Sequence, residues 1–197
     1  MIVRFCGADP GRWGGVARVA GVLDGDDFRA VEVRLDPMPV VERDGVGHEV
    51  DARVLAGLVH GLDYARIVVE RPAPGGQLQR GAASIVTQAA SFGEVLAVLK
   101  LTGCPVEQQP SSTSTRRELG LPTVPRGGDR KAANLADAEA LLERLVAGGC
   151  AVFGPPPARG YGGRIGGRQE SRSGMADALL LAWLGVHRWL GQGRRKR

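Results

Sequence analysis

The chain has 197 residues, of which 43% are hydrophobic, and it carries a formal net charge of +5 at pH 7. It has no apolar run near the roughly 20 residues that a membrane-spanning helix needs, no recognisable signal peptide and no Cys-x-x-Cys pair among its three cysteines. We therefore expect a cytoplasmic globular protein with one hydrophobic core, whose basic charge favours a polyanionic partner.

The first third of the chain has the pattern of three strands followed by a helix. Hydrophobic periodicity predicts strands over 2–8, 14–23 and 28–35, and Asp24-Gly25-Asp26 predicts the turn between the last two. Helical spacing of apolar residues then predicts a helix over 51–62.

The rest of the chain alternates strands with helices. We predict, in chain order, a strand over 65–70, a helical segment over 77–100 interrupted near Gly93, a strand over 104–109, helices over 112–119 and 130–147, a loop rich in Gly, Pro and Arg over 153–173, and an apolar helix over 174–190. This order indicates an α/β fold: a mixed five-stranded sheet, its first three strands antiparallel, flanked by helices. Residues 1–190 are expected to form a single domain, followed by a basic tail over 191–197.

Three acidic residues stand where the predicted elements meet. Asp9 ends the first strand, Glu70 ends the fourth, and Asp177 is the sole acid in the apolar segment 174–190. Strand ends in such a sheet open a crevice, and a helix packed across them would bring Asp177 to the same place. Clustered carboxylates raise one another's pKa unless a divalent cation neutralises them, and their oxygens suit Mg²⁺ or Mn²⁺.

Each acid also has a simpler explanation. Asp9 in Asp-Pro-Gly is good turn chemistry, Glu70 can pair with Arg71, and Asp177 near a helix N-terminus interacts favourably with the helix dipole. Taken singly, these explanations are favoured. The order and placement of the three acids together favour a metal site.

The segments GADPGRWGGVA, IVVERP and SGMADALLLA occur in this order, and together they resemble the RuvC-like Holliday junction resolvases of the RNase H-like nuclease superfamily, especially the small phage-type members. The resemblance covers roughly residues 2–185. It implies an RNase H-like fold and a homodimer that cuts four-way DNA junctions by metal-assisted phosphodiester hydrolysis. Asp9, Glu70 and Asp177 fall on the family's metal-binding acids, which hold two cations about 3.5–4 Å apart.

The resemblance also implies that two basic side chains take part in catalysis. The segment SSTSTRRELGL resembles the one that carries a catalytic lysine, with Arg116 at or beside that position. Lys131 resembles a second lysine that opens the next helix. The side chain of either Arg116 or Lys131 could stabilise the negative charge that develops on the phosphorane, although an arginine cannot transfer a proton.

Two departures from the family pattern bear on activity. The family usually has a fourth acid three or four residues before the helix Asp, where this chain has Ser173 and Gly174. Glu170 in the upstream loop is a candidate replacement, as is the more distant His187. The family's bulky wedge after the catalytic Glu is not obvious either, because Arg71-Pro72-Ala73-Pro74 stands there.

Arginines gather in the Gly- and Pro-rich connections, where they can reach a phosphate backbone. The candidates for DNA contacts are Arg117, Arg126, Arg130, Arg159, Arg164, Arg168 and Arg172. We expect the loop over 154–174 to be mobile without DNA and to become ordered on it, with Tyr161 stacking on an unpaired base. A plain connector is the alternative.

Three functions therefore compete. The first is a junction-selective endonuclease, in which symmetric incision requires a homodimer. The second is a nuclease of broad specificity for branched or linear DNA. The third is a DNA-binding protein with weak or no catalysis on the same scaffold, against which the retention of all three acids counts.

Overall fold

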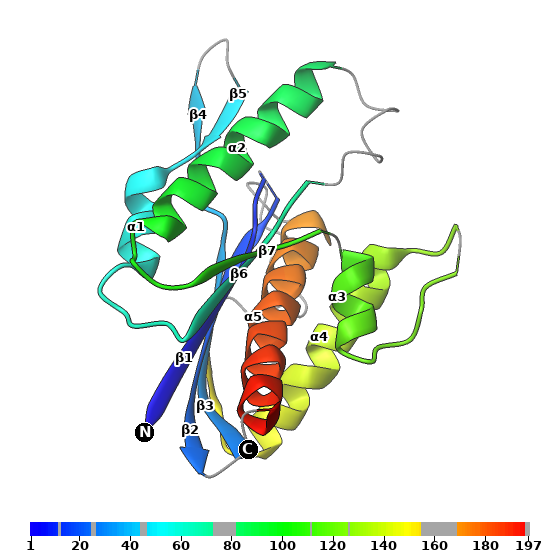
Figure 1. Ribbon diagram of the computed structural model, residues 1–197. Helices are drawn as coiled ribbons and strands as arrows, with labels where there is room; N and C mark the ends of the chain where they lie inside the picture. Colours follow the sequence, from blue (N-terminus) through cyan, green and yellow to red (C-terminus); the bar gives the residue numbers. More distant parts are fainter. Residues whose placement is uncertain are drawn as a thin grey trace.

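A single mixed sheet organises the chain, and helices cover both of its faces (Figure 1). The computed structural model describes residues 1–11, 13–24, 27–43, 47–72, 82–110, 112–125, 127–154 and 169–195. Side chains of the described residues 42, 43, 47, 48, 82–85, 169–172 and 193–195 are not placed.

The sheet has six strands in the order β7-β6-β1-β2-β3-β8. Their bounds are Ile2–Asp9 for β1, Gly15–Asp24 for β2, Asp27–Pro37 for β3, Arg66–Glu70 for β6, Val106–Gln109 for β7 and Ala151–Phe153 for β8. The pairs β1–β2 and β2–β3 are antiparallel, and β1–β6, β6–β7 and β3–β8 are parallel. The predicted α/β fold with three antiparallel strands first is confirmed, and β8 is a sixth strand beside the five predicted ones.

A small two-stranded sheet was not predicted. It pairs β4 (Val40–Arg43) with β5 (Gly47–Val50), and the backbone N–H of Asp51 donates to the carbonyl of Pro39 at its base. Each of its strands has four residues, the shortest length at which an alternating pattern indicates a strand.

One face of the main sheet is covered by α5 (Gln169–Arg195), which packs on β1, β2, β3 and β6. Helix α4 (Arg130–Ala147) packs beside it, and the short α3 (Ser112–Glu118) lies against α5 and β7 (Figure 1). Helix α5 begins before the predicted residue 174 and runs on to Arg195, beyond the predicted end at residue 190.

The other face is covered by α1 (Ala52–Val59) and α2 (Ala82–Lys100). Asp51 caps α1 by accepting hydrogen bonds from the backbone N–H groups of residues 53 and 54. Helix α2 passes through Gly93 without the predicted interruption. None of the described helices is long and apolar enough to cross a membrane.

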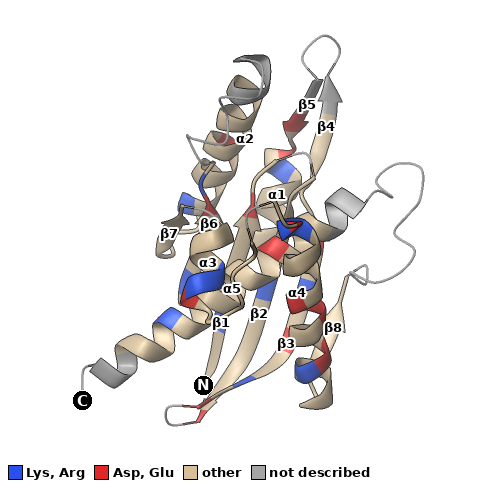
Figure 2. Ribbon diagram, turned by 90° about the vertical axis from the view of Figure 1, so that its right-hand side faces the viewer, with Lys and Arg blue, Asp and Glu red and all other residues tan. Residues whose placement is uncertain are grey.

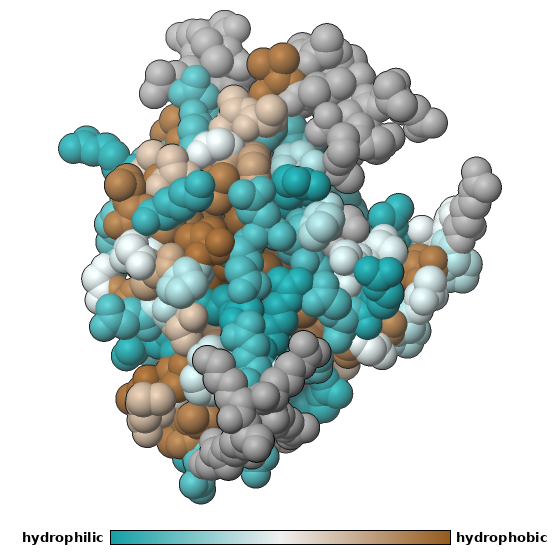
Figure 3. Space-filling model, viewed as in Figure 1, coloured by the Kyte–Doolittle hydropathy of each residue, from teal (hydrophilic) through white to brown (hydrophobic). Residues whose placement is uncertain are grey.

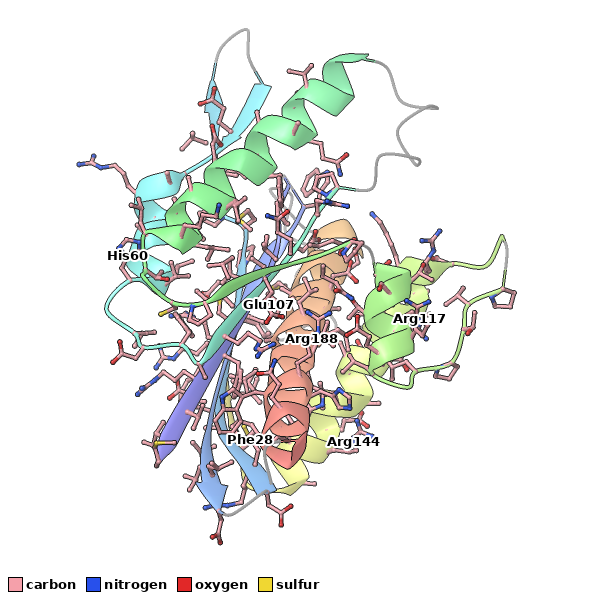
Figure 4. The ribbon with its side chains drawn as sticks, viewed as in Figure 1. Phe28, His60, Glu107, Arg117, Arg144 and Arg188 are labelled. Carbon is pink, nitrogen blue, oxygen red and sulfur yellow. The ribbon has the colours of Figure 1, made fainter. Side chains whose placement is uncertain are left out.

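A polar cluster ties the edge of the sheet to α5. Arg188 donates to both carboxylate oxygens of Glu118, to Glu107 and to Gln109, at 2.7–2.9 Å. Figure 4 shows Glu107 and Arg188 beside each other, and hydrophilic residues cover the same central region in Figure 3. This cluster joins β7 and α3 to α5, which lies about 70 residues further along the chain.

Candidate active site

An open cleft of about 800 Å³ lies at the carboxyl ends of β1 and β6 and contains the three predicted acids. Asp9, Glu70 and Asp177 all line it, although 61 and 107 positions separate them along the chain (70 − 9 and 177 − 70). The structure therefore brings together all three carboxylates that the sequence pointed to. Parallel strands β1 and β6 end at the same edge of the sheet, which is why the first two meet.

Asp9 is placed by the tight turn that joins β1 to β2. It pairs with Gly15 across the two strands, and the backbone N–H of Gly14 donates to the carbonyl of Gly11 at 3.0 Å. A Cβ atom at position 14 would lie 1.8 Å from the carbonyl oxygen of Asp9. Glycine at position 14 is therefore required for the turn that holds Asp9.

Asp177 is placed by close packing of α5 on that same turn. Gly14 forms a bridge with Gly174, and a Cβ at position 174 would lie 2.0 Å from the carbonyl oxygen of Trp13. The two glycines let the backbones approach, so that the turn of α5 that carries Ser173 and Asp177 faces Asp9 in the cleft.

The electrostatics of the cleft agree with this clustering. Burial, followed by the charges of Asp177 and Glu70, raises the pKa of Asp9 well above its ordinary value. Burial and the Asp177 charge raise the pKa of Glu70 to about 7, and burial raises the pKa of Asp177 to about 6. A hydrogen bond from Asn134 and the nearby Lys131 and Arg116 partly oppose the rise at Asp177. The three carboxylates thus repel one another unless protons or a cation neutralise them.

The donor set fits a hard divalent cation such as Mg²⁺ or Mn²⁺, because carboxylate oxygens are the ligands those ions prefer. Within the described part of the chain, no three His, Cys, Asp or Glu side chains converge closely enough to form a ready-made metal site.

Two basic residues at the start of α4 border the acids. Arg130 and Lys131 are exposed and line the cleft; Lys131 lowers the pKa of Asp9, and Arg130 that of Glu70. Asp129 caps α4 by accepting from the backbone N–H groups of residues 131 and 132. Figure 2 shows basic and acidic residues next to each other near the start of α4. The predicted proximity of Lys131 to the acids is confirmed.

Arg116 lies close to the site but behind it. Its side chain is buried, and the guanidinium bonds to the backbone carbonyl of Pro122, to Asn134 and to Asp137. It is absent from the residues that line the cleft. The guanidinium nevertheless lowers the pKa of Asp177, so the predicted proximity of Arg116 to the acids is confirmed, and its role in catalysis stays a prediction.

The remaining predicted residues fall into two groups. Arg117 is exposed on α3 and does not line the cleft (Figure 4), and His187 is exposed on α5, also outside the cleft. Glu170 and Arg172 lie in the helical backbone of α5, not in a loop, and their side chains are not placed. Arg126, Arg159, Tyr161, Arg164 and Arg168, with most of the 154–174 loop, lie outside the described residues.

Sequence reasoning missed several polar side chains that line the cleft. They are Trp13 beside Asp9, Thr87, Gln88 and Ser91 on α2, Ser112 on α3, and Asn134 on α4. Asn134 had a recognisable signal, because it stands one turn before Ala138 on the apolar stripe of its helix, where a polar residue is unusual. The cleft-lining residues of α2 had no recognisable signal in the sequence, since the path of that helix over the strand ends is set by packing.

The raised pKa values make stability depend on pH. Unfolded carboxyl groups titrate near about pH 4, whereas Asp177 and Glu70 in the folded protein have pKa values of about 6 and about 7. Between these limits the folded protein binds more protons than the unfolded chain, so the free energy of unfolding falls as pH rises. We expect the Tm to fall over this window, and Mg²⁺ to raise the Tm more at about pH 8 than at about pH 5 because ionised carboxylates bind the cation.

Thermal unfolding with and without Mg²⁺ measures both effects. The variant Glu70→Gln is the control: its Tm should depend less steeply on pH, because one of the raised groups is gone. An equal response to Mg²⁺ at both pH values would contradict cation binding by these carboxylates.

Comparison with known proteins gives likenesses in structure but none in sequence. No protein-family profile and no curated protein sequence matches the chain. The structure resembles RuvC of Thermus thermophilus bound to a Holliday junction substrate, with a TM-score of 0.51 at 15% identity over 98% of this chain and 96% of that one. Thermus thermophilus RuvC in a second structure gives 0.51 at 16% identity over 99% and 97%.

A third solved structure, the yeast mitochondrial Holliday junction resolvase, gives a TM-score of 0.46 at 14% identity over 99% of this chain and 82% of that one. At these identities the likeness to RuvC concerns the fold, and it extends over nearly the whole of both chains. The chain has the RuvC-like form of the RNase H fold.

Proposed function

We propose that the protein is a divalent-cation-dependent endonuclease that resolves four-way DNA junctions. The observation that carries the proposal is the convergence of Asp9, Glu70 and Asp177 from three separate elements on one open cleft bordered by Arg130 and Lys131. Acids suit the binding of a cation, and exposed basic residues beside them suit the binding of a phosphate. The junction bound in a solved structure of the same fold supports this choice of substrate.

Asp9, Glu70 and Asp177 are the residues that would hold Mg²⁺ or Mn²⁺. When bound, a pair of such cations activates water and stabilises the leaving oxygen of a phosphodiester. Lys131, close to both aspartates, is placed to offset negative charge on the phosphate, and Arg130 is placed to hold the DNA backbone near Glu70.

The proposed partner arrangement is a homodimer on branched DNA. A four-way junction presents two equivalent strands, so paired incisions need two active sites. Light scattering of the free protein and of its junction complex measures the number of subunits directly.

A cleavage assay tests the proposal. Four-way junctions, flaps and linear duplexes are incubated with the protein in Mg²⁺, in Mn²⁺ and in excess chelator. We expect the junction to be cut fastest and the chelator to stop cleavage. Tight junction binding without cleavage in either cation would overturn the proposed activity.

A second candidate, a nuclease of broad specificity, is favoured by one feature of the chain. Arg71 and Pro72 follow Glu70 directly, in place of a bulky residue that could separate base pairs at the centre of a junction. Equal rates on linear and four-way DNA in the same assay would select this function.

Ser173 stands where resolvases that this sequence resembles have a fourth acid. It is 3% exposed, lines the cleft and precedes Asp177 by one helical turn. We expect Ser173→Asp to raise the affinity for Mn²⁺ by about tenfold and to speed cleavage at limiting Mn²⁺, because a further carboxylate strengthens the ligand set.

The matched control is Gly174→Asp. A Cβ there would lie 2.0 Å from the carbonyl oxygen of Trp13, so this variant should lose stability and cleavage together. A well-folded Ser173→Asp protein with unchanged Mn²⁺ affinity would show that residue 173 does not face the cation.

A further inference from the structure

A continuous chain of hydrogen bonds connects the cleft to a buried arginine. Asn134 on α4 donates through its Nδ2 to Oδ1 of Asp177 on α5 and accepts at its Oδ1 from Nη1 of Arg116 on α3, at 2.8 Å. Nη1 of Arg116 also donates to Asp137 at 2.5 Å. Three helices are thus joined through one amide.

The surroundings fix Arg116 without any help from Asp177. Its Nε and Nη2 donate to the backbone carbonyl of Pro122 at 3.1 and 2.7 Å, and the carboxylate of Asp137 compensates its charge. The residue is 5% exposed. A buried guanidinium with this set of partners has one orientation, because moving it would leave a buried charge uncompensated.

The orientation of the Asn134 amide follows from its two neighbours. A guanidinium can only donate and an ionised carboxylate can only accept. The amide oxygen must therefore face Arg116, and the NH₂ group must face Asp177. A flipped amide would make two repulsive contacts, and with 3% exposure the side chain has no solvent to turn into.

We propose that Asn134 is a positioning residue for Asp177, and that Arg116 and Asp137 act through it. The amide holds one carboxylate oxygen of Asp177 and so directs the other oxygen towards the cleft, where Asn134 itself is part of the lining. A neutral amide does this without competing for the cation. The inference rests on the proposed function, in which Asp177 is a metal ligand.

The arrangement also explains why an arginine stands in the segment where the resembled family carries a lysine. The flat guanidinium bonds to Pro122, Asn134 and Asp137 at once. A lysine has a single nitrogen on a flexible stem and would not hold all three in this geometry. Arg116 thereby serves the site through packing and hydrogen bonds rather than through contact with DNA.

The test is Mn²⁺ binding by the purified full chain without DNA, measured by calorimetry, together with single-turnover cleavage and junction affinity. We expect Asn134→Leu, which keeps the shape and removes both hydrogen bonds, to weaken Mn²⁺ binding by about tenfold or more. Its single-turnover rate should fall at a fixed Mn²⁺ concentration, and its junction affinity without a divalent cation should stay within about twofold of the wild type. Arg116→Lys should also weaken Mn²⁺ binding, as Asn134→Leu does.

Arg188→Met is the matched control. Arg188 makes as many hydrogen bonds as Arg116 and also joins α5 to α3, but its partners Glu107, Gln109 and Glu118 do not line the cleft. This variant should lower the Tm and leave Mn²⁺ affinity unchanged.

Two results would overturn the inference. One is wild-type Mn²⁺ affinity in a folded Asn134→Leu protein; the other is equal weakening of Mn²⁺ binding by Arg188→Met, which would mean that general loosening is the cause. If the wild-type protein itself bound no Mn²⁺ and cut no DNA, the proposed function would fail and this inference with it.

Discussion

Replacing any one of the three cleft carboxylates by its amide is expected to reduce cleavage by about a thousandfold or more while leaving the protein able to bind DNA. The variants are Asp9→Asn, Glu70→Gln and Asp177→Asn. Each keeps the volume of the side chain and removes a negative charge that would bind the cation. Junction affinity is expected to stay the same or to rise, because repulsion between the cleft and the phosphates falls.

Cleavage and binding have to be measured on the same preparations. Single-turnover assays give the rate, and gel mobility without a divalent cation gives the affinity. Asp129→Asn is the matched control, since Asp129 also lines the cleft but its carboxylate accepts from the first backbone N–H groups of α4. Asparagine is an equally good helix cap, so this variant should cut normally. Near-normal cleavage by any of the three carboxylate variants would remove that residue from the metal site.

Gly7→Ala is expected to lower the free energy of unfolding by about 3 kcal/mol or more. A Cβ at position 7 would lie 2.1 Å from the carbonyl oxygen of Ala178 and 2.3 Å from the backbone nitrogen of Ala182, both in α5. Backbone atoms in a helix cannot turn aside as a side chain can, so the whole helix would have to move off β1. Since Asp177 directly precedes Ala178, cleavage by the folded fraction should fall too.

Chemical denaturation of the variant and the wild type measures the difference. Gly185→Ala serves as the control because it lies in the same contact of α5 with the sheet, where a Cβ would meet Phe5 at 3.4 Å and Val68 at 3.5 Å. There the methyl group fits, and loss of a helical glycine should raise stability by up to about 1 kcal/mol. If Gly7→Ala unfolded at the same denaturant concentration as the wild type, the close approach of β1 and α5 would be disproved.

Most of the main elements could be predicted from local pattern. Strands β1 and β6 are largely apolar, and β2 and β3 alternate buried with more exposed residues. The bounds of α4 match the predicted helix over 130–147 because Asp129 and Gly148 mark its two ends. The short β8 and the β4–β5 hairpin were missed, since three or four residues give a weak pattern, although β7, which has four residues, was predicted. Helix α5 begins at Gln169, earlier than predicted, because residues 169–173 adjoin a Gly- and Arg-rich segment and were predicted as part of a loop.

The sequence by itself determined five of the six strands of the main sheet and the three carboxylates of the site, because burial periodicity and an acid at the end of an apolar run are visible in neighbouring residues. Only the tertiary structure decided what surrounds those carboxylates. It buried Arg116 behind Asn134 and placed Ser173 in the cleft beside Asp177. It also required glycine at positions 7, 14 and 174, where backbones meet. These roles depend on distances between segments far apart in the chain, and such distances are set by how whole helices pack on the sheet.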